Sequence, residues 1–156
     1  MMSYKGGTTA KFHRAAIFIL LILYLACLTY LTFFSHLYGR ELTHRSVNYI
    51  PFTTVIKYLA TANSPAIIIT NILGNMAAFM PMGLLFPMAS GKLSRFKRTF
   101  AAVFIATAVI EVMQYVAGVG VSDIDDIILN LLGGAIGYGI YWRLNRIGKC
   151  LQQRLD

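Results

Sequence analysis

Residues 15–34 read AAIFILLILYLACLTYLTFF, twenty consecutive positions without a charged side chain. A helix rises about 1.5 Å per residue, so this run can cross the roughly 30 Å hydrocarbon core of a bilayer. The same length criterion identifies three further spans, at residues 65–89, 99–118 and 124–142. We therefore expect an all-α, polytopic membrane protein built as a bundle of four transmembrane helices.

The composition supports a lipid environment. Hydrophobic residues make up 57% of the chain, more than a soluble domain of 156 residues usually requires. Fourteen Lys and Arg oppose six Asp and Glu, giving a net charge of +8. These basic residues fall in short runs that flank the apolar spans, which is typical of contact with anionic lipid headgroups. A nucleic-acid partner is therefore not predicted.

The distribution of basic residues predicts the orientation of the chain. Eleven of the fourteen Lys and Arg lie in the N-terminus, the connection 90–98 and the C-terminal tail. By the positive-inside rule these three segments face the cytoplasm. We expect a cytoplasmic N-terminus at 1–14, a transmembrane domain at 15–142 and a cytoplasmic basic amphipathic tail at 143–156, with both termini inside.

Smaller features refine this bundle. The apolar positions Phe52, Val55, Ile56 and Leu59 follow helical spacing, which predicts an interfacial or re-entrant helix in the outer connection. Pro81 predicts a kink or early break in the second span. Five glycines are expected to allow helices to approach closely: Gly74, Gly133, Gly134, Gly137 and Gly139.

Amide and carboxyl side chains occur inside three of the expected spans, where a charged group costs on the order of 2.5–3.5 kcal/mol to insert. Asn71 and Asn75 lie four residues apart, and Glu111 and Gln114 lie three apart, so each pair shares one helix face. The fourth span opens with a further polar group: Asp123, Asp125, Asp126 and Asn130.

Five of these side chains are expected about 6–15 Å below the outer ends of their helices, and therefore inside the bundle: Asn71, Asn75, Glu111, Gln114 and Asn130. One interpretation is a structural layer of hydrogen bonds that sets helix register. The other is a ligand-binding site, because neighbouring carboxylates favour a proton, an amine or a cation. The sequence contains no HExxH, CxxC or glycine-rich phosphate motif, so no metal site or cofactor is predicted.

Three stretches together resemble the VanZ-like family across roughly residues 20–142. They are NILGNMAAFMPMG at 71–83 with the basic loop that follows, EVMQ at 111–114, and SDIDDIILNLLGG at 122–134. The segment NYIPF at 48–52 is similar to the family's Asn-x-x-Pro-Phe element. The resemblance implies that the polar residues above recur in the family.

The resemblance also implies a protein of the bacterial cytoplasmic membrane, because the family is bacterial and is named for a member linked to low-level teicoplanin resistance. Expected partners are membrane lipids, with a lipid-linked cell-wall precursor or a glycopeptide as candidate ligands at the outer face. Two alternatives stay open. One is a membrane-embedded enzyme acting on a lipid-linked or peptidoglycan intermediate, and the other is a small proton-coupled exporter, which would need a dimer.

Overall fold

A computed structural model describes residues 7–34, 47–61, 69–118 and 122–155. Within these ranges, four helical segments are long and apolar enough to cross a membrane. They correspond to α1 (Gly7–Phe33), α4 (Gly74–Ala89) with the π-helix η2 (Ile69–Leu73) before it, α5 (Phe96–Ala117) and α6 (Ile124–Leu155). The expected all-α membrane bundle is confirmed.

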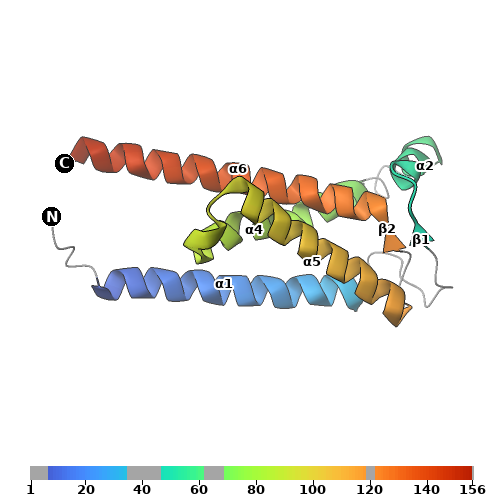
Figure 1. Ribbon diagram of the computed structural model, residues 1–156, viewed down its shortest axis with the longest axis horizontal. Coiled ribbons are helices and arrows are strands. Elements are labelled where there is room, and N and C mark those ends of the chain that lie inside the picture. Colours follow the sequence, from blue (N-terminus) through green and yellow to red (C-terminus); the bar gives the residue numbers. More distant parts are fainter. Residues whose placement is uncertain (1–6, 35–46, 62–68, 119–121, 156) are drawn as a thin grey trace.

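Two of the helices extend beyond their apolar runs. The helix α1 begins at Gly7 rather than at residue 15, and α6 continues from Trp142 to Leu155 as one helix. Charged residues such as Lys11 and Arg146 are good helix formers, so nothing in these flanks ends the helix where the lipid-compatible stretch ends. Figure 1 shows α6 running straight through this region. A membrane-surface position for the tail stays a prediction.

The second span differs from its prediction in one respect. Its first residues, 65–68, lie outside the described ranges, and its irregular turn is η2 rather than the turn at Pro81. The helix α4 continues through both Pro81 and Pro87, so the expected early break does not occur. The Tyr24 hydroxyl of α1 donates to the Ala78 carbonyl at 2.8 Å, which supports α4 close to the turn that Pro81 weakens.

The helices α4 and α6 pack backbone to backbone. A Cβ atom added at Gly133 would stand 2.0 Å from the Met76 carbonyl oxygen, and one added at Gly137 would stand 1.9 Å from that of Met80. The close approach predicted for these glycines is therefore confirmed. The prediction is wrong for Gly139, because no described atom lies within 4 Å of the place its Cβ would take.

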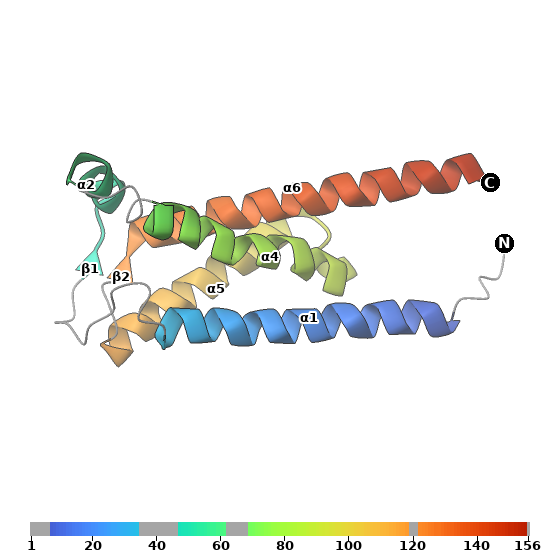
Figure 2. The ribbon, with the colours of Figure 1, turned by 180° about the vertical axis from the view of Figure 1, so that it is seen from behind.

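The two ends of the bundle differ. At one end, the short helix α2 (Thr53–Thr61) confirms the helix predicted in the outer connection. Beside it, β1 (Val47–Asn48) pairs in parallel with β2 (Ser122–Asp123). We call this the α2 end. Figures 1 and 2 show that α1 begins and α6 finishes at the opposite end.

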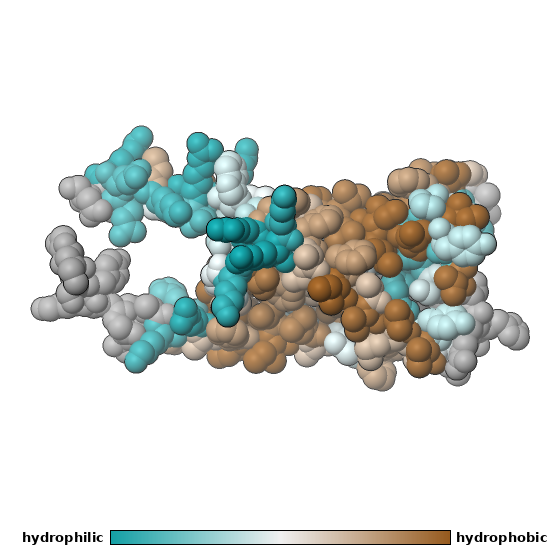
Figure 3. All heavy atoms as spheres, in the orientation of Figure 1, coloured by the Kyte–Doolittle hydropathy of each residue, from teal (hydrophilic) through white to brown (hydrophobic). Residues whose placement is uncertain are grey.

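The surface changes character between the ends. Figure 3 shows a broad hydrophobic band across the middle of the molecule and hydrophilic residues gathered at the end opposite α2. This end, which we call the basic end, carries exposed Lys and Arg from the 310-helix η3 (Gly91–Leu93), from the start of α5 and from α6: Lys92, Arg95, Lys97, Arg98, Arg143, Arg146, Lys149 and Arg154. Such a band flanked by charge is the surface that a bilayer requires.

Candidate polar pocket

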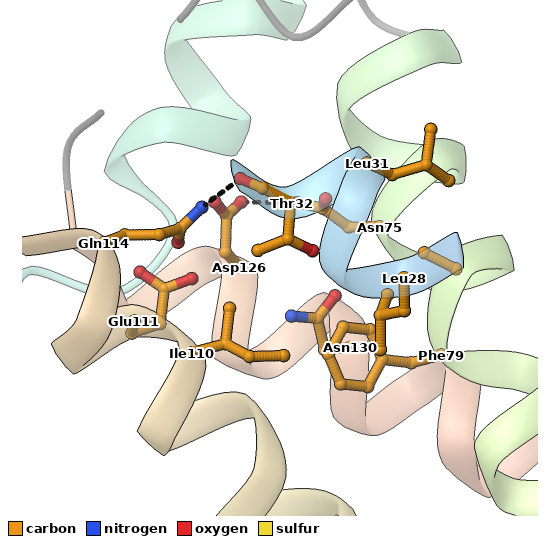
Figure 4. A pocket seen from close by; sticks show the side chains of 11 residues that line it. Leu28, Leu31, Thr32, Asn75, Phe79, Ile110, Glu111, Gln114, Asp126 and Asn130 are labelled. Carbon is orange, nitrogen blue, oxygen red and sulfur yellow. Dashed lines mark hydrogen bonds between the residues drawn. The ribbon is translucent and has the colours of Figure 1, made fainter. Parts of the chain in front are cut away.

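A pocket opens between all four long helices, toward the α2 end of the bundle. Figure 4 shows its side chains converging from α1, α4, α5 and α6. We call it the polar pocket, and it is lined by Leu28, Leu31, Thr32, Asn75, Ala78, Phe79, Ile110, Glu111, Gln114, Asp126 and Asn130. Its volume of about 30 Å³ is room for one or two water molecules.

Hydrogen bonds connect several of these polar side chains to neighbouring elements of the bundle. Asn75 Nδ2 of α4 donates to Asp126 Oδ1 of α6 at 2.5 Å, and Gln114 Nε2 of α5 donates to the Thr32 carbonyl of α1 at 3.3 Å. The backbone N–H of Asp123 donates to Glu111 Oε2 at 3.0 Å. The first two bonds join different helices and the third joins β2 to α5, so together they set the relative positions of the side chains that line the polar pocket.

Asn130 is satisfied on one side only. It is 4% exposed, and its Nδ2 donates to Thr107 Oγ1 at 2.8 Å. Its Oδ1 is buried, and the described part of the chain offers it no hydrogen-bond donor. Buried polar atoms are nearly always paired, so this carboxamide presents unused hydrogen-bonding capacity to the polar pocket.

The described lining of the polar pocket carries acidic side chains and no basic one. Glu111 and Asp126 contribute two carboxyl groups, and none of the described residues that line it is Lys, Arg or His. Glu111 is 4% exposed, so its carboxyl group lies where water screens electrostatic interactions weakly. In the described ranges, no group of three or more His, Cys, Asp or Glu could hold a metal ion. The described lining therefore offers carboxyl and amide groups that can exchange hydrogen bonds with a small polar group.

The side chains of Asp123 and Asp125 do not line the polar pocket. They accept hydrogen bonds from the segment around α2. Asp125 Oδ1 accepts from the Phe52 N–H at 2.5 Å, and its Oδ2 accepts from the N–H groups of Thr54 at 2.8 Å and Val55 at 3.1 Å. These N–H groups lie at the N-terminus of α2, so Asp125 caps that helix from α6. Being 1% exposed, the carboxylate acts as a buried anchor.

The Asp123 carboxylate makes further hydrogen bonds to the same segment. Asp123 Oδ1 accepts from Asn48 Nδ2 at 3.1 Å, and its Oδ2 accepts from the Thr54 hydroxyl. We call the set Asn48, Phe52, Thr54, Val55, Asp123 and Asp125 the clasp. Phe52 adopts a φ of 66°, a left-handed conformation that is costly for a bulky residue. The bond from its N–H to Asp125 helps to hold that conformation.

The eight residues predicted as one site thus occupy three places. Five line the polar pocket: Asn75, Glu111, Gln114, Asp126 and Asn130. Asp123 and Asp125 belong to the clasp, and Asn71 lies in η2 without lining the polar pocket. The sequence did not identify Thr32 and Thr107, because an isolated threonine costs little in an apolar helix and stands out from no pattern.

The family described as VanZ/LLP1 matches residues 21–145. The chain is also 31% identical over 141 residues to Protein VanZ of Enterococcus faecium, a match that covers 88% of this chain and 79% of that protein. No solved structure matches the chain. The family match includes every residue that lines the polar pocket, from Leu28 to Asn130.

Proposed function

The chain belongs to the VanZ/LLP1 family, and from this premise we propose that it binds a component of the bacterial cell envelope, or a glycopeptide, at the outer membrane face. In this way it contributes to teicoplanin-type resistance. The observation that carries the proposal is the polar pocket, in which amide and carboxyl groups of α4, α5 and α6 converge. Such a set of hydrogen-bonding groups, surrounded by apolar walls, is the usual composition of a ligand site.

The small volume of the polar pocket limits the form of this binding. About 30 Å³ admits one small polar group and not a whole glycopeptide or lipid headgroup. We infer that the remainder of the ligand lies against the α2 end or in the lipid beside α1. Exposed aromatic and aliphatic side chains at the α2 end, such as Tyr49, Ile50 and Phe52, support this arrangement.

The orientation belongs to the same proposal. We place the basic end in the cytoplasm and the α2 end outside, because Lys and Arg concentrate at one end of the described bundle. The polar pocket then lies in the outer leaflet half of the membrane, where envelope precursors and external glycopeptides are both accessible.

The test compares teicoplanin susceptibility in a sensitive host that expresses the wild type, Glu111→Gln or Asp126→Asn. Each substitution keeps the shape of the side chain and removes its charge. We expect protection to fall by roughly tenfold, because losing a charge-assisted hydrogen bond weakens binding by about that factor. Asn145→Ala, at an exposed position on the same α6 helix, serves as a control and should protect as the wild type does.

Membrane protein levels are matched by quantitative immunoblotting, so that a folding defect is not scored as loss of function. Unchanged protection by both charge-removing variants at equal protein level would exclude the polar pocket from the function.

A further inference from the structure

A groove lies at the basic end of the molecule, between the last turn of α4 and the part of α6 that follows its apolar span. We call it the basic groove. Its residues include Met88 of α4 with Tyr141, Leu144, Lys149 and Gln152 of α6, and those of α6 follow the spacing of one helix face. Its volume of about 420 Å³ is large enough for part of an organic ligand.

The glycine at position 148 helps to form the basic groove. Gly148 lies on the same α6 face, one turn after Leu144 and one turn before Gln152. A glycine destabilises a helix interior relative to alanine, and no described atom lies within 4 Å of the place its Cβ would take. Gly148 is therefore not required for close helix packing as Gly137 is. Its missing side chain leaves room that a ligand can occupy.

The basic groove is apolar at one end and polar at the other. Met88 and Leu144 lie near the apolar band, and Lys149 lies further along α6. Trp142 marks the boundary, because tryptophan is enriched at the level of lipid headgroups, and the Arg146 guanidinium carbon lies 5.2 Å from its ring centroid. Lys149 follows Trp142 by about 10 Å along the helix axis. Side chains lean toward the N-terminus of their helix, so the Lys149 side chain leans back toward the headgroup level.

Every described charged side chain at the basic end is Lys or Arg. Figure 3 shows these hydrophilic residues gathered beside the apolar band. The four carboxyl side chains of the described ranges belong to the polar pocket or to the clasp, nearer the α2 end. The field at the basic groove therefore attracts an anion and repels a cation such as a trimethylammonium group.

We propose that the basic groove binds an anionic phospholipid. The phosphate lies at Lys149 and Gln152, and the glycerol and first acyl carbons lie against Met88 and Leu144. A soluble anion would use only the polar end of the groove, whereas a lipid at the membrane boundary uses both ends. The inference is independent of the proposed function, because the basic groove lies at the end of the bundle opposite to α2 and takes a different ligand.

The experiment titrates the purified full chain in detergent with phosphatidylglycerol or phosphatidylcholine of identical acyl chains, and native mass spectrometry measures the affinity for the first lipid bound. We expect phosphatidylglycerol to bind roughly tenfold more tightly, because phosphatidylcholine adds a trimethylammonium group that the basic end repels. Glycerol 3-phosphate has the phosphate without acyl chains and should not displace phosphatidylglycerol at equal concentration. Equal binding of the two lipids, or displacement by glycerol 3-phosphate, would overturn the inference.

Three variants separate a defined site from general attraction to positive charge. Lys149→Gln should weaken phosphatidylglycerol binding by roughly tenfold. Gly148→Leu fills the groove without removing a charge and should weaken binding of both lipids by a similar factor. Arg143→Gln removes the same charge as Lys149→Gln from an exposed position outside the groove, and the affinity should stay within about twofold of the wild type.

Thermal unfolding in the same detergent checks that each variant is folded. Gly148→Leu should unfold as the wild type does, since its side chain points into open space. Equal losses of phosphatidylglycerol affinity in Lys149→Gln and Arg143→Gln would show a diffuse attraction and reject the site. Wild-type affinity in Gly148→Leu would likewise contradict a lipid in the basic groove.

Discussion

At the scale of single residues, the described protein uses its intramembrane acids in two different ways. Asp125 is surrounded by backbone N–H groups of residues 52–55 and holds a segment in place. Asp126, the next residue along the chain, turns into the polar pocket and meets Asn75. Adjacent residues on a helix point about 100° apart, so one acidic sequence can serve both an anchor and a pocket.

The clasp provides the first residue-scale prediction. Asp125→Ala removes the acceptor for three N–H groups at the start of α2, and we expect residues 47–61 to lose protection in hydrogen–deuterium exchange by about 1–3 kcal/mol. Asp125→Asn keeps one acceptor oxygen and should give a smaller loss. Protection of residues 47–61 that does not change in Asp125→Ala would show that the clasp does not hold α2.

A second residue-scale prediction concerns the pair that joins α4 to α6. Asn75→Leu removes the donor to Asp126 Oδ1 and leaves that carboxyl group facing an apolar side chain. We expect the free energy of unfolding in detergent to fall by about 1–3 kcal/mol. Asn75→Leu combined with Asp126→Leu should recover part of that loss. A double variant less stable than Asn75→Leu alone would contradict a paired role.

The free-energy cost of inserting polar groups into lipid made these residues recognisable in the sequence. It did not show which of them line the polar pocket and which belong to the clasp. Charged and amide groups inside apolar runs are conspicuous because lipid penalises them, and five of the eight do meet in one pocket. The clasp could not be derived in the same way. Its acceptors Asp123 and Asp125 bind a segment about seventy residues earlier in the chain, and long-range pairing of this kind leaves no local pattern.

At the scale of helices, the contact between α4 and α6 is fixed by positions that lack side chains. A Cβ at Gly133 or Gly137 would overlap a carbonyl oxygen of α4. Since backbone atoms cannot rotate away as side chains do, any larger residue must push the helices apart. The small-xxx-small spacing of these two glycines predicted the close approach, whereas Gly139 showed that a nearby glycine off that face carries no such constraint.

The glycines give a prediction with a control on the same helix. Gly137→Leu should lower the free energy of unfolding by at least about 1–3 kcal/mol, because the added side chain overpacks the α4–α6 contact. Gly139→Leu points into open space and should change stability by less than about 0.5 kcal/mol. The measurement is thermal unfolding in detergent by circular dichroism. Equal effects of the two substitutions would contradict the described packing.

The sequence predicted that each long helix exists better than it predicted the residues at which the helix begins and ends. Each of the four spans was correctly located from its apolar length, yet α1 and α6 both continue into polar flanks. Hydropathy reports where lipid begins and ends, and helix propensity decides where the helix ends, so the two boundaries need not coincide. Pro81 was expected to kink or break the second span, and the break does not occur. Tertiary contacts such as the Tyr24–Ala78 bond support the helix there.

At the scale of the whole molecule, charge asymmetry predicts how the chain lies in the membrane. Cys150 is exposed near the end of α6, at the basic end, and Tyr49 is 76% exposed at the α2 end. In intact cells, we expect a membrane-impermeant maleimide to label a Tyr49→Cys variant from outside. Cys150 should be labelled only after the membrane is opened. Labelling of Cys150 in intact cells would reverse the proposed orientation.

The polar pocket is either a site for a ligand or a sealed layer of hydrogen bonds, and its content distinguishes the two. The most direct measurement is a high-resolution structure of the protein in nanodiscs after extraction with native membrane components. We predict density in the polar pocket within hydrogen-bond distance of the Asn130 carboxamide and of Glu111 or Asp126. A pocket closed by rotation of Asn130 onto a neighbouring side chain, with no volume left between the four helices, would contradict the account.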